Sequence, residues 1–304
     1  MMQWLGERRE FLSVDVETTG LNVGRDRVRL CQFGDHTKGW ALDWSEWKGV
    51  CREAIERYEG PIVAHNLLYD SKMLKHEGVV IPQHQAHCTM VMTNLVDAAS
   101  RMDLKGASER YVDKRARAGQ NALRRAFAAG DYDYATIPID HPSYWVYSTL
   151  DTVLCSMLAS ALYPRTGGGP YRRAYETEMA AIHCLREAEL AGMLTDPDYR
   201  ARASSQLREE LAGLEAQFPP DLKTDSEAQV VRYLQEQGAV LTVRTENGNL
   251  SVDKHVLKML APQFPVAALI ARHRGRSRML NNYLYKMDAL AVGDVVYANT
   301  RPLG

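Results

Sequence analysis

Apolar and polar side chains alternate along the first part of the chain. Residues 11–17 follow this pattern and end at a Thr-Thr-Gly turn, which predicts a strand followed by a tight turn. Residues 27–33 and 39–43 have the same strand character on either side of a Gly-Asp-His-Thr segment. We therefore expect a three-stranded antiparallel meander at the start of the fold.

A helical segment and a short apolar run follow. Residues 45–58 have helical spacing, and Gly60-Pro61 precedes the apolar residues 62–64, which predicts a buried strand. Asn66 stands where the next helix should begin and is a residue type favoured at helix N-caps. Strands followed by alternating helices favour an α/β fold, with a mixed sheet covered by helices.

The remainder of the chain has mainly helical spacing. From residue 89 to about 162 this spacing is interrupted by Pro138 and Pro142. The segment Tyr-Pro-Arg-Thr-Gly-Gly-Gly-Pro at 163–170 is the strongest linker signal, so we expect one domain over 1–165 and a second over 166–304. In the second domain we expect helices at about 175–191, 198–218, 226–238, 253–260 and 264–287.

Composition narrows the class of protein. The 304 residues are 45% hydrophobic and 25% charged, as in ordinary globular proteins, and the net charge of −1 means that any nucleic-acid surface must be local. The five cysteines form no Cys-x-x-Cys pair, which argues against a zinc site or a disulfide framework. The first residues do not form a signal peptide, and no apolar run approaches 18 residues. We expect a cytoplasmic protein with no membrane partner.

Candidate chemistry begins with three acidic residues. Asp15 and Glu17 project from one face of the first predicted strand, about 7 Å apart at most, a spacing that can hold a metal ion. Asp70 lies in the first turn of the helix after the 62–64 strand, where α/β sheets commonly carry sites. The ordinary alternatives are a solvated strand face for the first two and a favourable helix-dipole position for Asp70.

A fourth acid lies on an apolar helix. Tyr147 and Asp151 are four residues apart and share one helical face. A buried Asp151 would need a partner because an unpaired buried charge is unfavourable, and a metal ion would serve. The alternative is a half-exposed Asp on an amphipathic helix.

Together these segments resemble the three motifs of the DnaQ-like exonuclease superfamily. Asp15-Val-Glu17-Thr18, the Asn-Leu-Leu-Tyr-Asp segment at 66–70 and Tyr147-x-x-x-Asp151 occur in the family's order over roughly the first 165 residues. The resemblance implies an RNase H-like fold. Val146 stands where histidine-containing relatives would carry their histidine, so the chain resembles the tyrosine subgroup.

The resemblance also implies a catalytic scheme. It predicts a 3′→5′ exonuclease that uses two divalent ions, and the oxygen ligands suit Mg²⁺ or Mn²⁺. Asp15 would bridge both ions, Glu17 and Asp151 would hold the ion near the attacking water, and Asp70 would act indirectly on the other. Tyr147 would orient the water.

Three further residues are expected at the DNA. Thr18 and Asn66 belong to the first and second motifs, and Leu21 follows the Thr-Thr-Gly turn. By resemblance, Leu21 would wedge against the terminal base, although an ordinary core leucine is an equally good interpretation. The expected substrate is single-stranded DNA or a frayed primer 3′ end, as in proofreading.

The second half resembles the region that follows the exonuclease domain in family A DNA polymerases. Residues 175–179, 190–196 and 247–251 resemble landmarks at the start of the thumb, and 272–284 resembles the thumb helix along the minor groove. Basic side chains there could neutralise phosphates, or could merely form a solvated helix. The arginines concerned are Arg272, Arg274, Arg276 and Arg278.

The chain has no counterpart of the family's palm aspartates or fingers helix. We therefore expect no polymerase activity from this chain alone, and a separate palm and fingers chain is one partner that the resemblance leaves open. Two other hypotheses remain: a catalytically silent DNA-binding or assembly subunit of a split polymerase, and an RNA-trimming enzyme with the same nuclease core. The thumb-like second half argues against the RNA enzyme.

Overall fold

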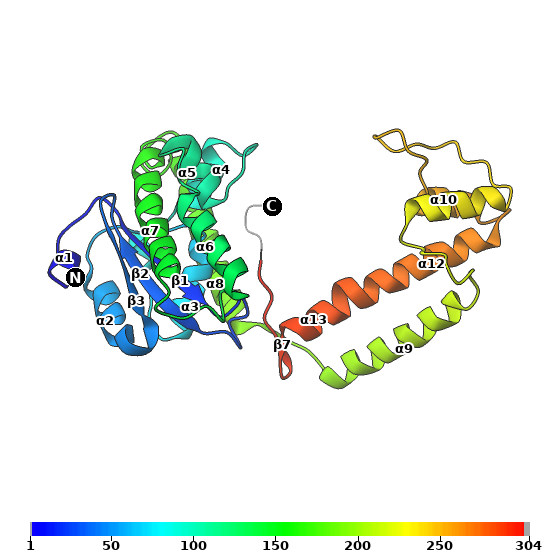
Figure 1. Cartoon of the computed structure of the whole chain (residues 1–304), viewed down its shortest axis with the longest axis horizontal. Coiled ribbons are helices and arrows are strands. Elements are labelled where there is room, and N and C mark those ends of the chain that lie inside the picture. The colour runs from blue at the N-terminus through cyan, green and yellow to red at the C-terminus, as the bar shows by residue number, and fades with distance from the viewer. Residues whose placement is uncertain (1, 301–304) are drawn as a thin grey trace. The chain divides into compact units, whose positions relative to one another are not determined.

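The computed structural model describes residues 2–300 (Figure 1). Contacts divide the chain into two compact units. Unit 1 comprises the chain up to Gly192 together with the segment from Tyr297, and unit 2 comprises Met193–Val296. The expected α/β fold followed by a helical region is confirmed. The expected boundary after residue 165 is not where the contacts divide.

Unit 1 contains a five-stranded mixed sheet with the order β3-β2-β1-β4-β5. The predicted meander is confirmed, because β1 and β3 both pair antiparallel with β2, whereas β4 and β5 run parallel to β1. Only β5 was not predicted. The strands are β1 (Leu12–Thr18), β2 (Val28–Gly34), β3 (Gly39–Asp43), β4 (Ile62–Ala64) and β5 (Ala86–Cys88).

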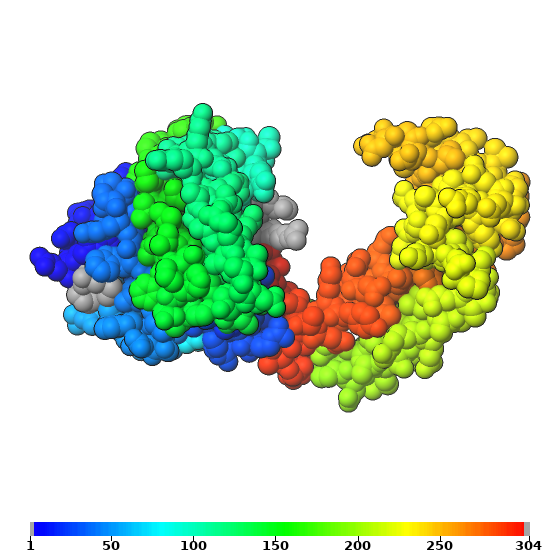
Figure 2. Space-filling view, in the orientation of Figure 1, coloured from blue at the N-terminus to red at the C-terminus, as the bar shows by residue number. Residues whose placement is uncertain are grey.

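Helices cover this sheet, and α7 lies against it, in contact with β1, β2 and β3. Pro142 occupies the first turn of α7, where its missing N–H is tolerated, so it begins the helix instead of interrupting one. Residues of α6 and α7 form much of the visible face of unit 1 (Figure 2). The helices are α1 (Met2–Leu5), α2 (Trp44–Arg57), α3 (Leu67–His76), the 3₁₀ turn η1 (Gln83–Gln85), α4 (Thr89–Val96), α5 (Leu104–Tyr111), α6 (Ala118–Gly130), α7 (Pro142–Leu162) and α8 (Arg172–Ala191).

Within the described residues, α7 is long and apolar enough to span a membrane by length and composition alone. Its contacts show that this apolar surface packs in the core of unit 1. Leu158, Ala159 and Leu162 are buried in the same cluster as the strands of the sheet. This burial is typical of the core helix of a globular unit.

The contact division differs from the expected boundary for a physical reason that can be seen in α8. The 163–170 segment forms hydrogen-bonded turns, with Thr166 fully buried at 0% exposure. The next helix, α8, packs against α3 and α4. Glu189 of α8 forms a buried ion pair with Lys72 of α3, at 2.6 Å. Backbone and side chain of Thr300 also donate to Glu189, which joins the end of the described chain to unit 1.

Unit 2 is mainly helical and has its own apolar core, which includes Leu214, Val230, Leu257 and Ile270. The predicted helices are confirmed, except that the last one contains a π-helical segment, and a small sheet of order β6-β8-β7 was not predicted. The elements are β6 (Met193–Leu194), α9 (Pro197–Glu215), α10 (Glu227–Glu236), α11 (Lys254–Leu260), α12 (Pro265–Met279), π-helix η2 (Leu280–Leu284), α13 (Tyr285–Leu290), β7 (Ala291–Val292) and β8 (Val295–Val296).

Candidate active site

One cavity of about 520 Å³ in unit 1 brings together the four acids and the tyrosine singled out in the sequence. Their side chains come from β1, α3 and α7, which are far apart along the chain. Other lining residues come from the turn after β1 and from the loop between α6 and α7. The cavity is lined by Asp15, Val16, Glu17, Thr18, Thr19, Gly20, Leu21, His65, Tyr69, Asp70, Asp133, Tyr134, Ala135, Tyr147 and Asp151.

The order of the sheet explains why these acids meet. Asp15 and Glu17 lie on β1, between β2 and β4. Asp70 is in the first turn of α3, which follows β4, the parallel neighbour of β1. Tyr147 and Asp151 lie on α7, which packs on β1 and β2. The carboxyl end of β1, the first turn of α3 and one face of α7 therefore converge on one cavity.

Asp70 is bound directly to β1. Its side chain is 2% exposed, and its Oδ1 accepts a hydrogen bond from the backbone N–H of Val16 at 3.2 Å. A side-chain hydrogen bond also joins Asp70 to Asp15. Carboxyl groups this close share a proton readily, because two like charges disfavour each other in a poorly solvated place.

The electrostatics of the cavity reflect an excess of acid. Removal from bulk water raises the pKa of Asp15 to about 6, although Lys105 opposes this shift. Burial, followed by the charge of Asp15, raises the pKa of Glu17 and of Asp70 well above the ordinary carboxyl range. A divalent cation would relieve this repulsion, and a set of carboxylate oxygens is the donor chemistry that Mg²⁺ and Mn²⁺ prefer.

Lys105 supplies a positive charge that sequence reasoning missed. Its side chain is 4% exposed and its ammonium forms an ion pair with Asp151. The same ammonium lies 4.9 Å from the centroid of the Tyr147 ring. Burial lowers the pKa of Lys105 to about 8, while Asp15 and Glu17 act to raise it. No spacing pattern links Lys105 to the motifs, so only the fold could reveal it.

The acids of the site already have partners within the protein. Within residues 2–300, no group of three or more acidic, histidine or cysteine side chains could hold a metal ion as it stands. Asp151 is paired with Lys105, and Asp15 is hydrogen-bonded to Asp70. The donor types and the excess negative charge fit divalent ions, and binding of an ion would require these partners to be exchanged.

A second tyrosine, Tyr134, also escaped the sequence analysis. Its ring lies 6.3 Å from that of Tyr147, and a side-chain hydrogen bond joins the two residues. Burial raises the pKa of Tyr147, so its hydroxyl stays neutral. Arg29 holds the Tyr134 loop by donating to the carbonyl of Ile137 at 2.6 Å. The aromatic pair was not recognisable because Tyr134 lies in a polar loop.

The turn after β1 is held by two hydroxyl groups. Thr18 and Tyr69 both donate to the carbonyl of Gly20, at 2.8 and 2.9 Å. Leu21 follows this carbonyl and is 65% exposed at the cavity. The interpretation of Leu21 as an ordinary core leucine is therefore wrong.

Asn66 differs from its prediction. It occupies the N-cap position of α3, but its φ of 66° is left-handed and its side chain forms no capping hydrogen bond. The neighbouring His65 lines the cavity instead, with its Nδ1 2.9 Å from Thr89 Oγ1. Burial lowers the pKa of His65 to about 4. The sharp backbone turn at Asn66, a residue type that tolerates this conformation, directs β4 into α3.

The four arginines of α12 do not form one free basic row. Arg272 and Arg276 both pair with Glu210, at 2.5 and 3.0 Å. Arg274 donates to two backbone carbonyls of unit 2, those of Thr224 and Val252, both at 2.6 Å. Arg278 is exposed. Alternate positions cover more than one helix face, so only part of this predicted phosphate-binding set faces solvent.

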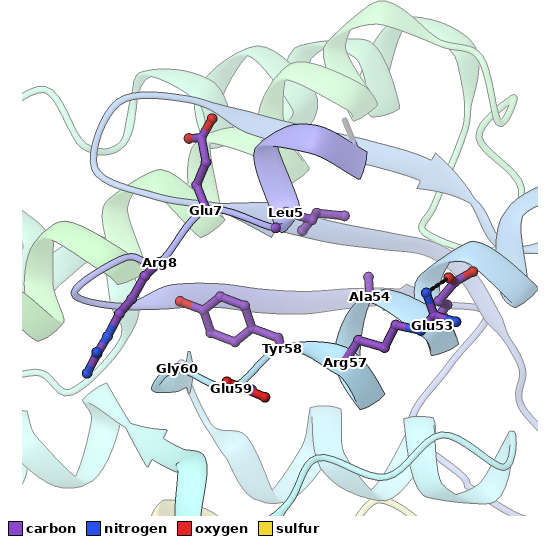
Figure 3. Close-up of a pocket in the computed structure, with 10 residues that line it drawn as sticks. Leu5, Glu7, Arg8, Glu53, Ala54, Arg57, Tyr58, Glu59 and Gly60 are labelled. Atoms are coloured by element: carbon purple, nitrogen blue, oxygen red, sulfur yellow. Dashed lines mark ion pairs between the residues drawn. The ribbon is translucent and has the colours of Figure 1, made fainter.

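A separate hollow of about 500 Å³ lies between the start of the chain and the end of α2 (Figure 3). Its side chains are of mixed charge, and Glu53 and Arg57 pair with each other at 2.7 Å. Figure 3 shows this pair beside Tyr58. The hollow has no converging set of acids, so the carboxylate cavity is the better candidate for catalysis.

Comparison with known proteins identifies a family for most of unit 1. Residues 5–165 match the family model described as 3′-5′ exonuclease. The chain is 26% identical over 270 residues to a DNA polymerase of Mycobacterium phage D29, covering 80% of this chain and 44% of that protein. It is 24% identical over 290 residues to a DNA polymerase of Mycobacterium phage L5, covering 86% and 47% respectively.

A solved structure shows the same fold. The POL domain of Pol1 from M. smegmatis, in complex with DNA primer-template and dNTP, matches with a TM-score of 0.65 and 16% identity, over 94% of this chain and 48% of that one. The chain thus spans less than half the length of these relatives. Because the family model covers more than half of its residues, the chain belongs to the 3′-5′ exonuclease family found in family A DNA polymerases.

Proposed function

We propose that this chain is a metal-dependent 3′→5′ exodeoxyribonuclease of the proofreading type, which removes single nucleotides from DNA 3′ ends. The observation that carries the proposal is the convergence of Asp15, Glu17, Asp70, Asp151 and Tyr147 on one cavity. Three separate elements contribute these side chains, and burial together with the charge of Asp15 raises the pKa of Glu17 and of Asp70.

Asp15, Glu17 and Asp151 would hold divalent ions, with Asp70 acting through its hydrogen bond to Asp15. Such ions would supply Lewis-acid stabilisation of the charge that develops on the scissile phosphate. The protein's own work is to keep these oxygens converging. The Val16 N–H does so for Asp70, and the packing of α7 on β1 does so for Asp151.

Tyr147 would orient the attacking water. Its hydroxyl is neutral and can both donate and accept, so it suits a positioning role better than a metal-binding one. Tyr134 would hold that hydroxyl through the hydrogen bond between the two side chains. Leu21, exposed beside the cavity, would pack against the terminal base, and Thr18 and Tyr69 would keep the turn that presents it.

The substrate we propose is single-stranded DNA or a frayed primer end. A cavity of this size admits an unpaired terminal nucleotide, whereas a base pair must first be opened. Polymerase activity is not part of the proposal, which concerns only the carboxylate cavity of unit 1.

The test is hydrolysis of a single strand labelled so that loss of the 3′ nucleotide is visible, as DNA and as RNA, with Mg²⁺, Mn²⁺ or EDTA. We expect one-nucleotide steps on DNA that require metal, and loss of these steps in Asp15→Ala. Glu46→Ala is the matched control, since Glu46 is an exposed acid of α2 outside the cavity. Hydrolysis by Asp15→Ala at the parent rate, or no hydrolysis by the parent, would refute the assignment.

A further inference from the structure

Lys105 occupies a position that its own helix does not favour. Asp103 caps α5 by accepting from the Gly106 N–H at 3.0 Å, so Lys105 lies in the first turn. A positive charge there interacts unfavourably with the helix dipole. Burial also removes the ammonium from water, which is unfavourable for a charged group. The side chain is nevertheless 4% exposed. Something outside α5 must therefore stabilise it.

The carboxylate cavity provides that stabilisation. The ammonium of Lys105 pairs with Asp151, lies over the ring of Tyr147, and is attracted by Asp15 and Glu17. The nearby Arg29 also attracts Glu17, but its guanidinium donates to the carbonyls of the loop that follows α6. Within residues 2–300, Lys105 is thus the cation that pairs directly with an acid of the cavity.

We infer that Lys105 is a built-in counter-cation of the proposed metal site: it holds Asp151 while no divalent ion is bound, and an ion can bind only when the ammonium leaves that carboxylate. The inference rests on the proposed function. Its physical basis is mutual exclusion, because two cations on one carboxylate repel each other strongly in a poorly solvated cavity. Lys105 therefore stabilises the metal-free protein and weakens metal binding, which sets the divalent concentration that the site requires.

The experiment is a Mn²⁺ titration by calorimetry without DNA, on the parent, Lys105→Met and Lys105→Gln. Met keeps the apolar stem, and Gln keeps a polar end without charge. Both variants should bind Mn²⁺ about tenfold more tightly, within the usual range of coupling between linked binding events. In EDTA both should unfold at a lower temperature than the parent, and saturating Mn²⁺ should raise their unfolding temperature more than the parent's.

Lys72→Met is the matched control. Lys72 is the other buried lysine of unit 1 with an ion-pair partner, at 1% exposure and 2.6 Å from Glu189, and it does not line the cavity. This variant should also unfold at a lower temperature, but its Mn²⁺ dissociation constant should equal that of the parent. The comparison separates loss of a buried ammonium in general from loss of the one beside Asp151.

The outcomes distinguish this inference from the proposed function. If the parent binds Mn²⁺ and both Lys105 variants bind it equally or more weakly, Lys105 is not a counter-cation, whatever the nuclease assay shows. If the variants bind more tightly but the parent does not hydrolyse DNA, the nuclease proposal fails and the Lys105 inference stands. A parent that binds no Mn²⁺ contradicts both. Variants that fold only with Mn²⁺ support the inference, and variants that fold in neither condition overturn it.

Discussion

Asp70 Oδ1 accepts a hydrogen bond from the backbone N–H of Val16, 3.2 Å away, although the two residues are 54 positions apart in the chain. This contact ties the first turn of α3 to β1 between Asp15 and Glu17. It gives Asp70 a structural role as an acceptor in addition to its charge. The two roles can be separated by substitution.

Asp70→Asn retains an oxygen that can accept from Val16 but removes a charge that burial and Asp15 disfavour. We expect its unfolding temperature in EDTA to equal or exceed that of the parent, while nuclease activity falls by at least about tenfold. Asp70→Leu removes the acceptor as well and should be less stable than Asp70→Asn, because an unpaired buried N–H costs about 1–3 kcal/mol. Denaturant unfolding of the two variants checks this order.

Asp15 should make the metal-free protein less stable at neutral pH than at acid pH. Its pKa is raised from 3.8 to about 6 in the folded protein, so its ionised form is disfavoured by folding. The resulting loss of folding stability is absent below the pKa of the unfolded chain. It grows as the pH rises and is complete above a pH of about 6.

Asp15→Asn should accordingly stabilise the protein in EDTA by about 1–3 kcal/mol at pH 8 and by almost nothing at pH 4. Denaturant unfolding at both pH values, with Glu46→Gln as control, measures this difference. A constant gain at both pH values would mean that the charge of Asp15 is not the cause.

Tyr147→Phe separates water orientation from metal binding. The variant keeps the ring that Lys105 and Tyr134 contact but loses one hydroxyl. We expect the cleavage rate at saturating metal to fall about 10²- to 10³-fold, with metal affinity retained. Asp151→Ala should be slower still and partly restored by excess Mn²⁺, whereas Tyr147→Phe should not respond. A Tyr147→Phe rate equal to the parent's would remove the hydroxyl from the mechanism.

Leu21→Ala tests the wedge. Because the side chain is 65% exposed, we expect stability to change by less than about 0.5 kcal/mol. Cleavage of single strands should fall slightly, and cleavage of paired ends should fall much more, with mismatched ends between. Rates on the three substrates, measured side by side with the parent, check this order. An equal loss on all three would show that Leu21 does not help to separate the end.

Arg274 and Arg278 should behave differently despite their shared helix. Arg274→Ala leaves two carbonyls without their donor and should destabilise unit 2 by about 1.5–3 kcal/mol. Arg278→Ala should leave stability unchanged and weaken DNA binding uniformly across sequences, with a smaller dependence on salt. Fluorescence anisotropy with a labelled duplex at several salt concentrations makes the comparison. Loss of DNA binding only in Arg274→Ala would mean that Arg274, and not Arg278, contacts the DNA.

Much of unit 1 could be predicted because its signals are local. Alternation identified β1, β2 and β3, and the apolar run at 62–64 identified β4, which is buried on both faces. Helical spacing placed Tyr147 and Asp151 on one face of α7. Local pattern made each acid a candidate, and the resemblance to the exonuclease motifs joined the four into one expected site.

The partners of those acids were decided only by the tertiary structure. Lys105 and Tyr134 reach the cavity from a short helix and a loop, and neither has a spacing that relates it to Asp151 or Tyr147. The glycine-rich segment predicts flexibility, yet α8 stays with unit 1 because Lys72 and Glu189 pair in its interior. Local sequence determines where a side chain points along its own element. Which charged group it contacts depends on long-range packing. Burial strengthens the electrostatic interaction between the two groups, because little water remains to screen it, and this is enough to shift a pKa and to hold a lysine beside a carboxylate.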